Sequence, residues 1–118
     1  METLATIFVL IVALEHFYIL ALEMFFLSSR PALRTFNLTK EAASDPRIKT
    51  LFANQGLYNG FLAAGLIFGL MLGSSAVQLF FLACVIIAAL YGAATANLSI
   101  LWKQGLPAMI AFLLVLFV

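Results

Sequence analysis

The sequence has few charged residues and little cysteine. Only six of its 118 residues are Lys or Arg and five are Asp or Glu, whereas 65% are hydrophobic. A soluble domain usually has about 25% charged and about 45–50% apolar residues, so a soluble globular fold is excluded. A net charge of +1 leaves no basic face for nucleic acid. Because Cys84 is the only cysteine, a disulfide-stapled secreted scaffold is excluded as well.

The sequence is instead rich in long apolar stretches. A helix needs roughly 20 apolar residues to cross the hydrocarbon core of a bilayer, and four stretches come near that length. They predict a single all-α domain over residues 1–118, an integral membrane four-helix bundle with four transmembrane helices. The last span is short, so it either begins earlier, through Trp102, or crosses a locally thinned bilayer. The spans are expected at about residues 3–27, 51–72, 77–97 and 106–118.

The basic residues fall on one side of this four-span pattern. The loop over residues 28–50 holds all of them except Lys103, which lies between the third and fourth spans. Cytoplasmic loops of membrane proteins carry the excess of Lys and Arg. We therefore expect a cytoplasmic loop at 28–50, extracytoplasmic termini, and a multi-pass protein among the lipids of the bacterial cytoplasmic (inner) membrane. Within the loop, Asp45 followed by Pro46 is typical of a helix start.

Small residues recur at four-residue spacing in the second span. Gly56 and Gly60 form one pair, and Gly65, Gly69 and Gly73 continue the pattern. Small residues let helices approach closely in lipid, where no hydrophobic force joins them. We expect these stripes to pack the helices of one subunit against each other. A contact between copies in a homo-oligomer is the alternative.

Polar side chains gather in the half of the spans nearest the cytoplasm. Ionisable groups at membrane depth cost about 2.5–3.5 kcal/mol on insertion scales and usually face a bundle interior or a wet cavity. His16 and Glu23 share a helix face, as do Gln55, Tyr58 and Asn59. We predict a polar pocket that opens to the cytoplasm and is closed outward by apolar residues. Its candidate lining residues are Glu15, His16, Glu23, Asn54, Gln55, Tyr58, Asn59, Tyr91, Thr95 and Gln104.

Three uses of this pocket stay open. In the first, the Glu and His side chains lie on the path of a small molecule or ion that the protein binds or transports. In the second, the pocket holds or converts a membrane-soluble amphiphile, such as an isoprenoid, a quinone or a lipid. In the third, the polar groups only lock the helices together. One histidine without a cysteine partner is a weak metal signal, so we predict no metal site and no cofactor, and we assign no catalytic residue.

Five blocks of the sequence are similar to a known family. The blocks are Leu14–Tyr18 (LEHFY), Leu22–Phe25 (LEMF), Asn54–Ala63 (NQGLYNGFLA), Tyr91–Thr95 (YGAAT) and Gln104–Ala108 (QGLPA). In this order they resemble a bacterial and fungal family of small four-helix membrane proteins, known as a domain of unknown function of about this length. The resemblance covers nearly the whole chain. It implies a stand-alone integral membrane protein and no particular activity.

Overall fold

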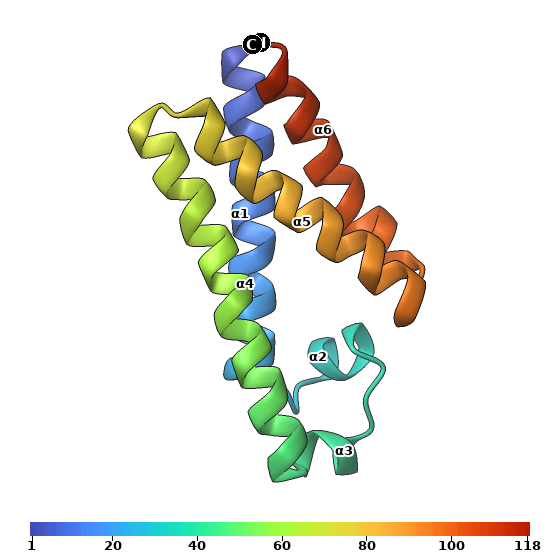
Figure 1. Ribbon diagram of the computed structural model, residues 1–118. Coiled ribbons are helices and arrows are strands. Elements are labelled where there is room, and N and C mark those ends of the chain that lie inside the picture. The colour runs from blue at the N-terminus through green and yellow to red at the C-terminus, as the bar shows by residue number, and fades with distance from the viewer. The chain divides into compact units, whose positions relative to one another are not determined.

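The computed structural model describes all 118 residues, and its regular structure is entirely helical. Two short helices follow the first long helix, two long helices come next, and a π-helical turn runs directly into the last, shorter helix (Figure 1). The predicted all-α class is therefore confirmed. The elements in chain order are α1 (Glu2–Met24), α2 (Arg30–Thr35), α3 (Lys40–Ser44), α4 (Pro46–Leu72), α5 (Ser75–Thr95), η1 (Leu101–Gly105) and α6 (Leu106–Leu116).

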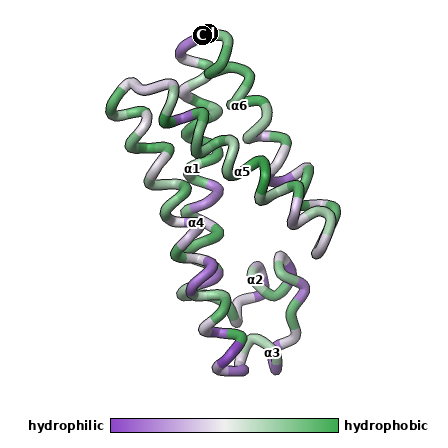
Figure 2. Tube along the Cα trace, in the orientation of Figure 1, coloured by the Kyte–Doolittle hydropathy of each residue, from purple (hydrophilic) through white to green (hydrophobic).

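Three of these helices, α1, α4 and α5, are long and apolar enough to cross a membrane. Figure 2 shows hydrophobic residues along most of α1, α5 and α6, and hydrophilic residues around α3 and the start of α4. The last apolar stretch, Leu101–Leu116, is helical but shorter. The helical stretch thus begins before residue 106 and includes Trp102, which agrees with the alternative of an earlier start. A fourth membrane crossing by this stretch stays a prediction.

The chain divides into two compact units. The terminal unit contains residues 1–15 and 62–118, and the central unit contains residues 16–61. The start of α1, the end of α4, α5 and α6 all contribute to the apolar core of the terminal unit. Its fully buried members are Val9, Val12, Ala13, Ala63, Leu66, Leu82, Ala108 and Ala111. The prediction of one domain over the whole chain stays a prediction.

The two chain ends and the α4–α5 turn lie at the same end of the terminal unit (Figure 1). Glu2, Gly73 and Val118 line one small cleft there. Gly73 has a φ of 63°, a left-handed conformation that suits glycine. The next residue, Ser74, caps α5 because its hydroxyl accepts a hydrogen bond from the backbone N–H of Val77 at 3.2 Å. This end of the unit contains no Lys or Arg.

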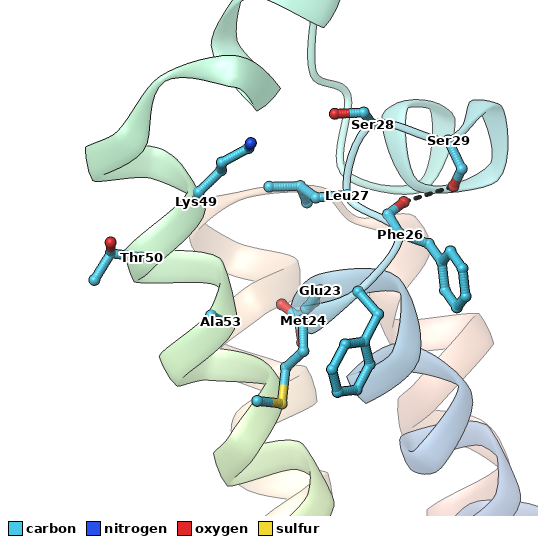
Figure 3. A pocket seen from close by; sticks show the side chains of 10 residues that line it. Glu23, Met24, Phe26, Leu27, Ser28, Ser29, Lys49, Thr50 and Ala53 are labelled. Carbon is cyan, nitrogen blue, oxygen red and sulfur yellow. Dashed lines mark hydrogen bonds between the residues drawn. The ribbon is translucent and has the colours of Figure 1, made fainter.

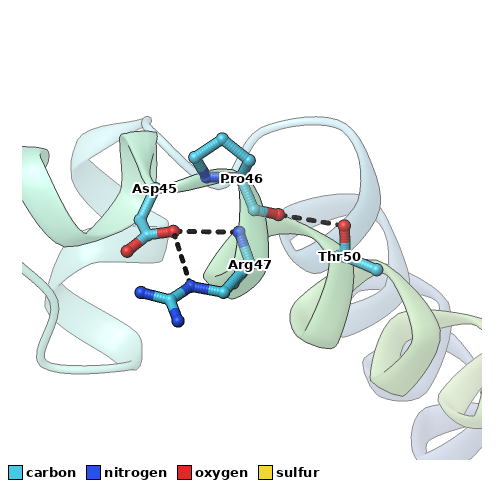
Figure 4. A network of polar contacts seen from close by, with 4 residues as sticks. All are labelled: Asp45, Pro46, Arg47 and Thr50. Atoms are coloured by element: carbon cyan, nitrogen blue, oxygen red, sulfur yellow. Dashed lines mark hydrogen bonds and ion pairs between the residues drawn. The ribbon is translucent and has the colours of Figure 1, made fainter.

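The central unit contains the end of α1, helices α2 and α3, and the start of α4. Helix α4 begins at Pro46, as predicted, because Asp45 caps it (Figure 4). The Asp45 Oδ1 accepts a hydrogen bond from the backbone N–H of Arg47 at 2.9 Å and lies 3.9 Å from Arg47 Nε. A carboxylate at a helix N-terminus satisfies an otherwise unpaired N–H group and complements the helix dipole. This cap fixes the residue at which α4 begins.

The glycines of α4 lie against other helices of the same chain. A Cβ on Gly56 would be 2.7 Å from Met24 Cγ and 3.3 Å from the backbone oxygen of Leu20, and a Cβ on Gly60 would overlap the Leu20 side chain. In the terminal unit, a Cβ on Gly69 would be 2.9 Å from Gln78 Cγ. Such close approach is what small residues provide in membrane helices. These positions therefore serve packing within one subunit, and a homo-oligomer stays a prediction.

Candidate functional site

A buried carboxylate joins two helices of the central unit. Glu23 lies in the last turn of α1 and is only 1% exposed. Gln55 Nε2 donates a hydrogen bond to Glu23 Oε2 at 2.5 Å, and Asn59 Nδ2 donates one to Glu23 Oε1 at 2.6 Å. Residues four apart in a helix lie on one face, so the two amides of α4 reach both oxygens of one carboxylate. We call these three side chains the carboxylate–amide cluster.

The surroundings of Glu23 explain why it needs two partners. An ionisable side chain removed from water is costly unless its polar atoms are hydrogen-bonded. Gly56 lies between the two amides in the sequence. A Cβ on Gly56 would be 3.0 Å from Glu23 Cβ, so the missing side chain lets α4 lie close to α1 at this point. The small residue and the two amides thus act together. The resulting bonds hold α1 against α4, and each such interhelical bond contributes about 0.6–2 kcal/mol.

A cleft of about 560 Å³ in the central unit is lined by the end of α1, the segment that follows it and the start of α4. This volume is within the roughly 300–1,000 Å³ range of small-ligand sites. Figure 3 shows Lys49 projecting from α4, Ser28 on the segment that follows α1, and Glu23 beside Met24 at the end of α1. The lining residues are Glu23, Met24, Phe25, Phe26, Leu27, Ser28, Ser29, Lys49, Thr50 and Ala53.

The outer part of the cleft offers free hydrogen-bond donors. The Lys49 ammonium makes no ion pair, because the single ion pair of the chain joins Arg47 and Asp45. The Ser28 hydroxyl makes no hydrogen bond, whereas the Ser29 hydroxyl donates to the backbone oxygen of Phe26 at 2.6 Å. The lining therefore combines an exposed, unpaired cation and an exposed free hydroxyl, which we take as the mouth of the cleft, with the buried Glu23, which we take as its floor.

Two of the other predicted pocket residues on α4 point elsewhere. Asn54 Nδ2 donates to the backbone oxygen of Thr50 at 3.0 Å within its own helix. Tyr58 is 66% exposed and packs edge-on against Phe61, with ring centroids 5.8 Å apart. On α1, His16 is buried in the central unit, at 2% exposed, and does not line the cleft. The structure thus brings together Glu23 and two of the four polar α4 residues in the predicted set.

The remaining predicted residues belong to the terminal unit. Glu15 is partly buried, and its Oε1 is buried without a hydrogen-bond partner. Tyr91 is 73% exposed, and Thr95 donates its hydroxyl to the Tyr91 backbone oxygen at 2.7 Å. Gln104 is half-buried within η1. No group of three or more His, Cys, Asp and Glu side chains is placed to hold a metal ion.

Sequence reasoning missed the mouth of the cleft. In the sequence, Lys49 is only one of the charges of the 28–50 loop that orient the protein in the membrane, and no pattern gives Ser28 a role. One signal was present: Lys49 and Ala53 are four residues apart and share a helix face, and both line the cleft. Ser28 carried no such signal, because its place depends on how the chain turns after α1.

The fold is thus a helical one with three helices long and apolar enough to cross a membrane and a polar cluster between two of them. Residues 10–116 match the family described as "Protein of unknown function (DUF1304)", and the chain belongs to this family. It is similar to "Uncharacterized protein YpaA" of Lactococcus lactis subsp. lactis (strain IL1403), with 41% identity over 115 residues that cover 96% of this chain and 97% of that protein. No solved structure matches the chain. The resemblance to a family of unknown function is thereby confirmed.

Proposed function

We propose that this protein is a multi-pass protein of the bacterial cytoplasmic membrane that binds or transports a small molecule through the cleft ending at Glu23. The observation that carries the proposal is the cleft itself. Its lining includes exposed residues of the central unit together with Glu23, which is 1% exposed. Ionisable groups at membrane depth are rare, and those that occur commonly mark substrate and ion pathways. The amides of Gln55 and Asn59 hold this carboxylate in one position.

The distribution of charge supports a cytoplasmic opening. Residues 28–50 hold five of the six basic residues, whereas the end of the terminal unit with both chain termini and Gly73 holds none. Lys and Arg accumulate on the cytoplasmic side of membrane proteins. Ser28 and Lys49 are the first and next-to-last residues of that basic loop, and both line the cleft. The proposed ligand therefore enters from the cytoplasmic side or from the inner leaflet.

Filling the cleft tests this proposal. Ala53 lines the cleft and is half-buried, so Ala53→Phe places a ring in the ligand's space. Ala64→Phe is the matched control, because Ala64 is exposed on the same helix and lines neither cleft. Native mass spectrometry of protein extracted in mild detergent should find a bound small molecule in the wild type and in Ala64→Phe. It should be lost in Ala53→Phe, and equal occupancy in all three proteins would overturn the proposal.

A purely structural role is the second candidate, and one observation favours it. Both Glu23 oxygens already accept a hydrogen bond from α4, so the carboxylate–amide cluster is complete as a helix lock. In that case Ala53→Phe changes neither the bound molecules nor the phenotype. Substitutions in the cluster then lower the stability of the protein and affect nothing else.

A further inference from the structure

We infer that the cleft takes the headgroup of a phospholipid, with the phosphodiester at Lys49 and Ser28 and the far end of the headgroup donating a hydrogen bond to Glu23. This inference rests on the proposed function and narrows it to one ligand class. It requires three things of the cleft: a place at headgroup depth, donors for a phosphate near the mouth, and an acceptor at the floor.

The sequence around the cleft places it at the depth of lipid headgroups. Helix α1 ends at Met24, and the two residues that follow, Phe25 and Phe26, are 69% and 58% exposed. Beyond them begins the basic loop of residues 28–50, which has five cations and two acidic residues, Glu41 and Asp45. The change from apolar helix to basic loop marks the cytoplasmic interface. Exposed rings at such a boundary contact acyl chains, while the basic loop meets the headgroups.

The mouth of the cleft offers hydrogen-bond donors to an anion. The Lys49 ammonium has three N–H donors and no ion-pair partner, and the Ser28 hydroxyl is also free. A phosphodiester carries a negative charge and its two unesterified oxygens only accept hydrogen bonds, so these two groups complement it. Basic pockets between membrane helices on the cytoplasmic side bind lipid headgroups in this way.

The floor of the cleft demands the opposite chemistry. The Glu23 carboxylate is acceptor-only, and each of its oxygens has one amide partner and one further lone pair. A second anion placed there would be repelled, whereas an N–H or O–H donor would complete the site. Ethanolamine and glycerol headgroups end in such donors. The trimethylammonium of a choline headgroup has none, so choline is the poorer occupant.

Lipid titration of the full-length protein by native mass spectrometry tests this assignment. The probes are dioleoyl phosphatidylethanolamine, phosphatidylglycerol and phosphatidylcholine, with soluble glycerophosphoethanolamine as a fourth arm. We expect the ethanolamine and glycerol lipids to bind roughly tenfold more tightly than the choline lipid, the worth of one charge-assisted hydrogen bond. Lys49→Gln should weaken those two lipids by about the same factor.

Lys40→Gln is the matched control, because Lys40 is an exposed lysine of the same loop that does not line the cleft. Equal loss in Lys40→Gln and Lys49→Gln would overturn the inference, as it would show general attraction to anions. Equal binding of the choline lipid would overturn the role of Glu23 as the acceptor. If glycerophosphoethanolamine binds as tightly as the lipid, the ligand is a soluble phosphodiester. That result would overturn a membrane lipid as the ligand and support the phosphodiester chemistry of the cleft.

The inference and the proposed function fail in different ways. A bound molecule that Ala53→Phe removes, with no lipid dependence on Lys49, would overturn the headgroup assignment and leave the cleft as a ligand site. A bound lipid that responds to Lys49→Gln but not to Ala53→Phe would place the lipid outside the cleft. That result would overturn both statements.

Discussion

Asn59 Nδ2 lies 2.6 Å from Glu23 Oε1, and this hydrogen bond joins two residues that are 36 positions apart in the chain. Gln55 makes the matching contact to the other oxygen. The last turn of α1 is thereby fixed to the middle of α4. The same carboxylate is the floor of the cleft. Glu23 thus belongs both to an interhelical contact and to the lining of the cleft, and substitutions can separate the two roles.

The first prediction compares two asparagines of α4. Asn59→Ala removes an interhelical hydrogen bond and should lower the free energy of unfolding by about 0.6–2 kcal/mol. Asn54 bonds only to Thr50 in its own helix, so Asn54→Ala should change it by less than about 0.5 kcal/mol. Denaturation of the purified protein in mixed detergent micelles measures both values. Equal effects of the two substitutions would show that the Asn59 bond does not hold α1 to α4.

The second prediction concerns the charge of Glu23 and its shape separately. Glu23→Gln keeps the shape, and rotation of one neighbouring amide lets the new carboxamide make two hydrogen bonds. Glu23→Ala leaves the amides of Gln55 and Asn59 without a partner, which costs about 1–3 kcal/mol. We expect Glu23→Ala to be clearly less stable than Glu23→Gln in the same denaturation assay. If the two variants are equally destabilised, the charge of the carboxylate rather than its hydrogen bonding supports the fold.

Much of the fold follows from the sequence by simple physical rules. The length of the apolar stretches predicts α1, α4 and α5 within a few residues, because the bilayer thickness sets the length of a spanning helix. The start of α4 follows from Asp45 and Pro46, since a cap acts over only a few residues. Glu23 and the α4 amides were also in the predicted site. Their common face follows from helical spacing.

The rest of the site depends on helix rotation and on loop paths, which periodicity does not determine. Tyr58 shares the predicted face of Gln55 and Asn59, yet it is 66% exposed. A helix face is an arc of the surface, and only part of that arc contacts the neighbouring helix. Lys49 and Ser28 meet at one cleft only because the chain leaves α1 and enters α4 at particular angles. Gly56 is one residue whose close contact with α1 depends on such angles. A sequence alone does not show which neighbour a glycine accommodates.

The third prediction separates the two glycines of the α1 contact. A Cβ on Gly56 meets Met24 Cγ at 2.7 Å and the Leu20 backbone oxygen at 3.3 Å, so α4 itself has to move. A Cβ on Gly60 meets only the far end of the Leu20 side chain, which can turn aside. Gly56→Ala should cost about 1–3 kcal/mol and Gly60→Ala less, by detergent denaturation. The reverse order would mean that the α1–α4 contact is looser at Gly56 than at Gly60.

The fourth prediction concerns the orientation of the chain in the membrane. In a Cys84→Ala background, Ser75→Cys and Ser44→Cys place single thiols on two exposed serines. Ser75 lies at the α4–α5 turn and Ser44 in the basic loop. A membrane-impermeant maleimide added to intact spheroplasts should label Ser75→Cys and leave Ser44→Cys unlabelled, because Lys and Arg keep their loop in the cytoplasm. Inside-out vesicles should give the opposite pattern.

A third thiol in the same experiment decides between three and four membrane crossings. Val118→Cys places it at the end of the chain, and Val118 is 52% exposed and lines the same small cleft as Ser75. If Leu101–Leu116 crosses the membrane, Val118→Cys is labelled from outside together with Ser75→Cys. The helix is short, at about 24 Å for its 16 residues, so the bilayer would have to thin locally to match it. Labelling of Val118→Cys from the cytoplasmic side alone would contradict the fourth span and leave the chain with three.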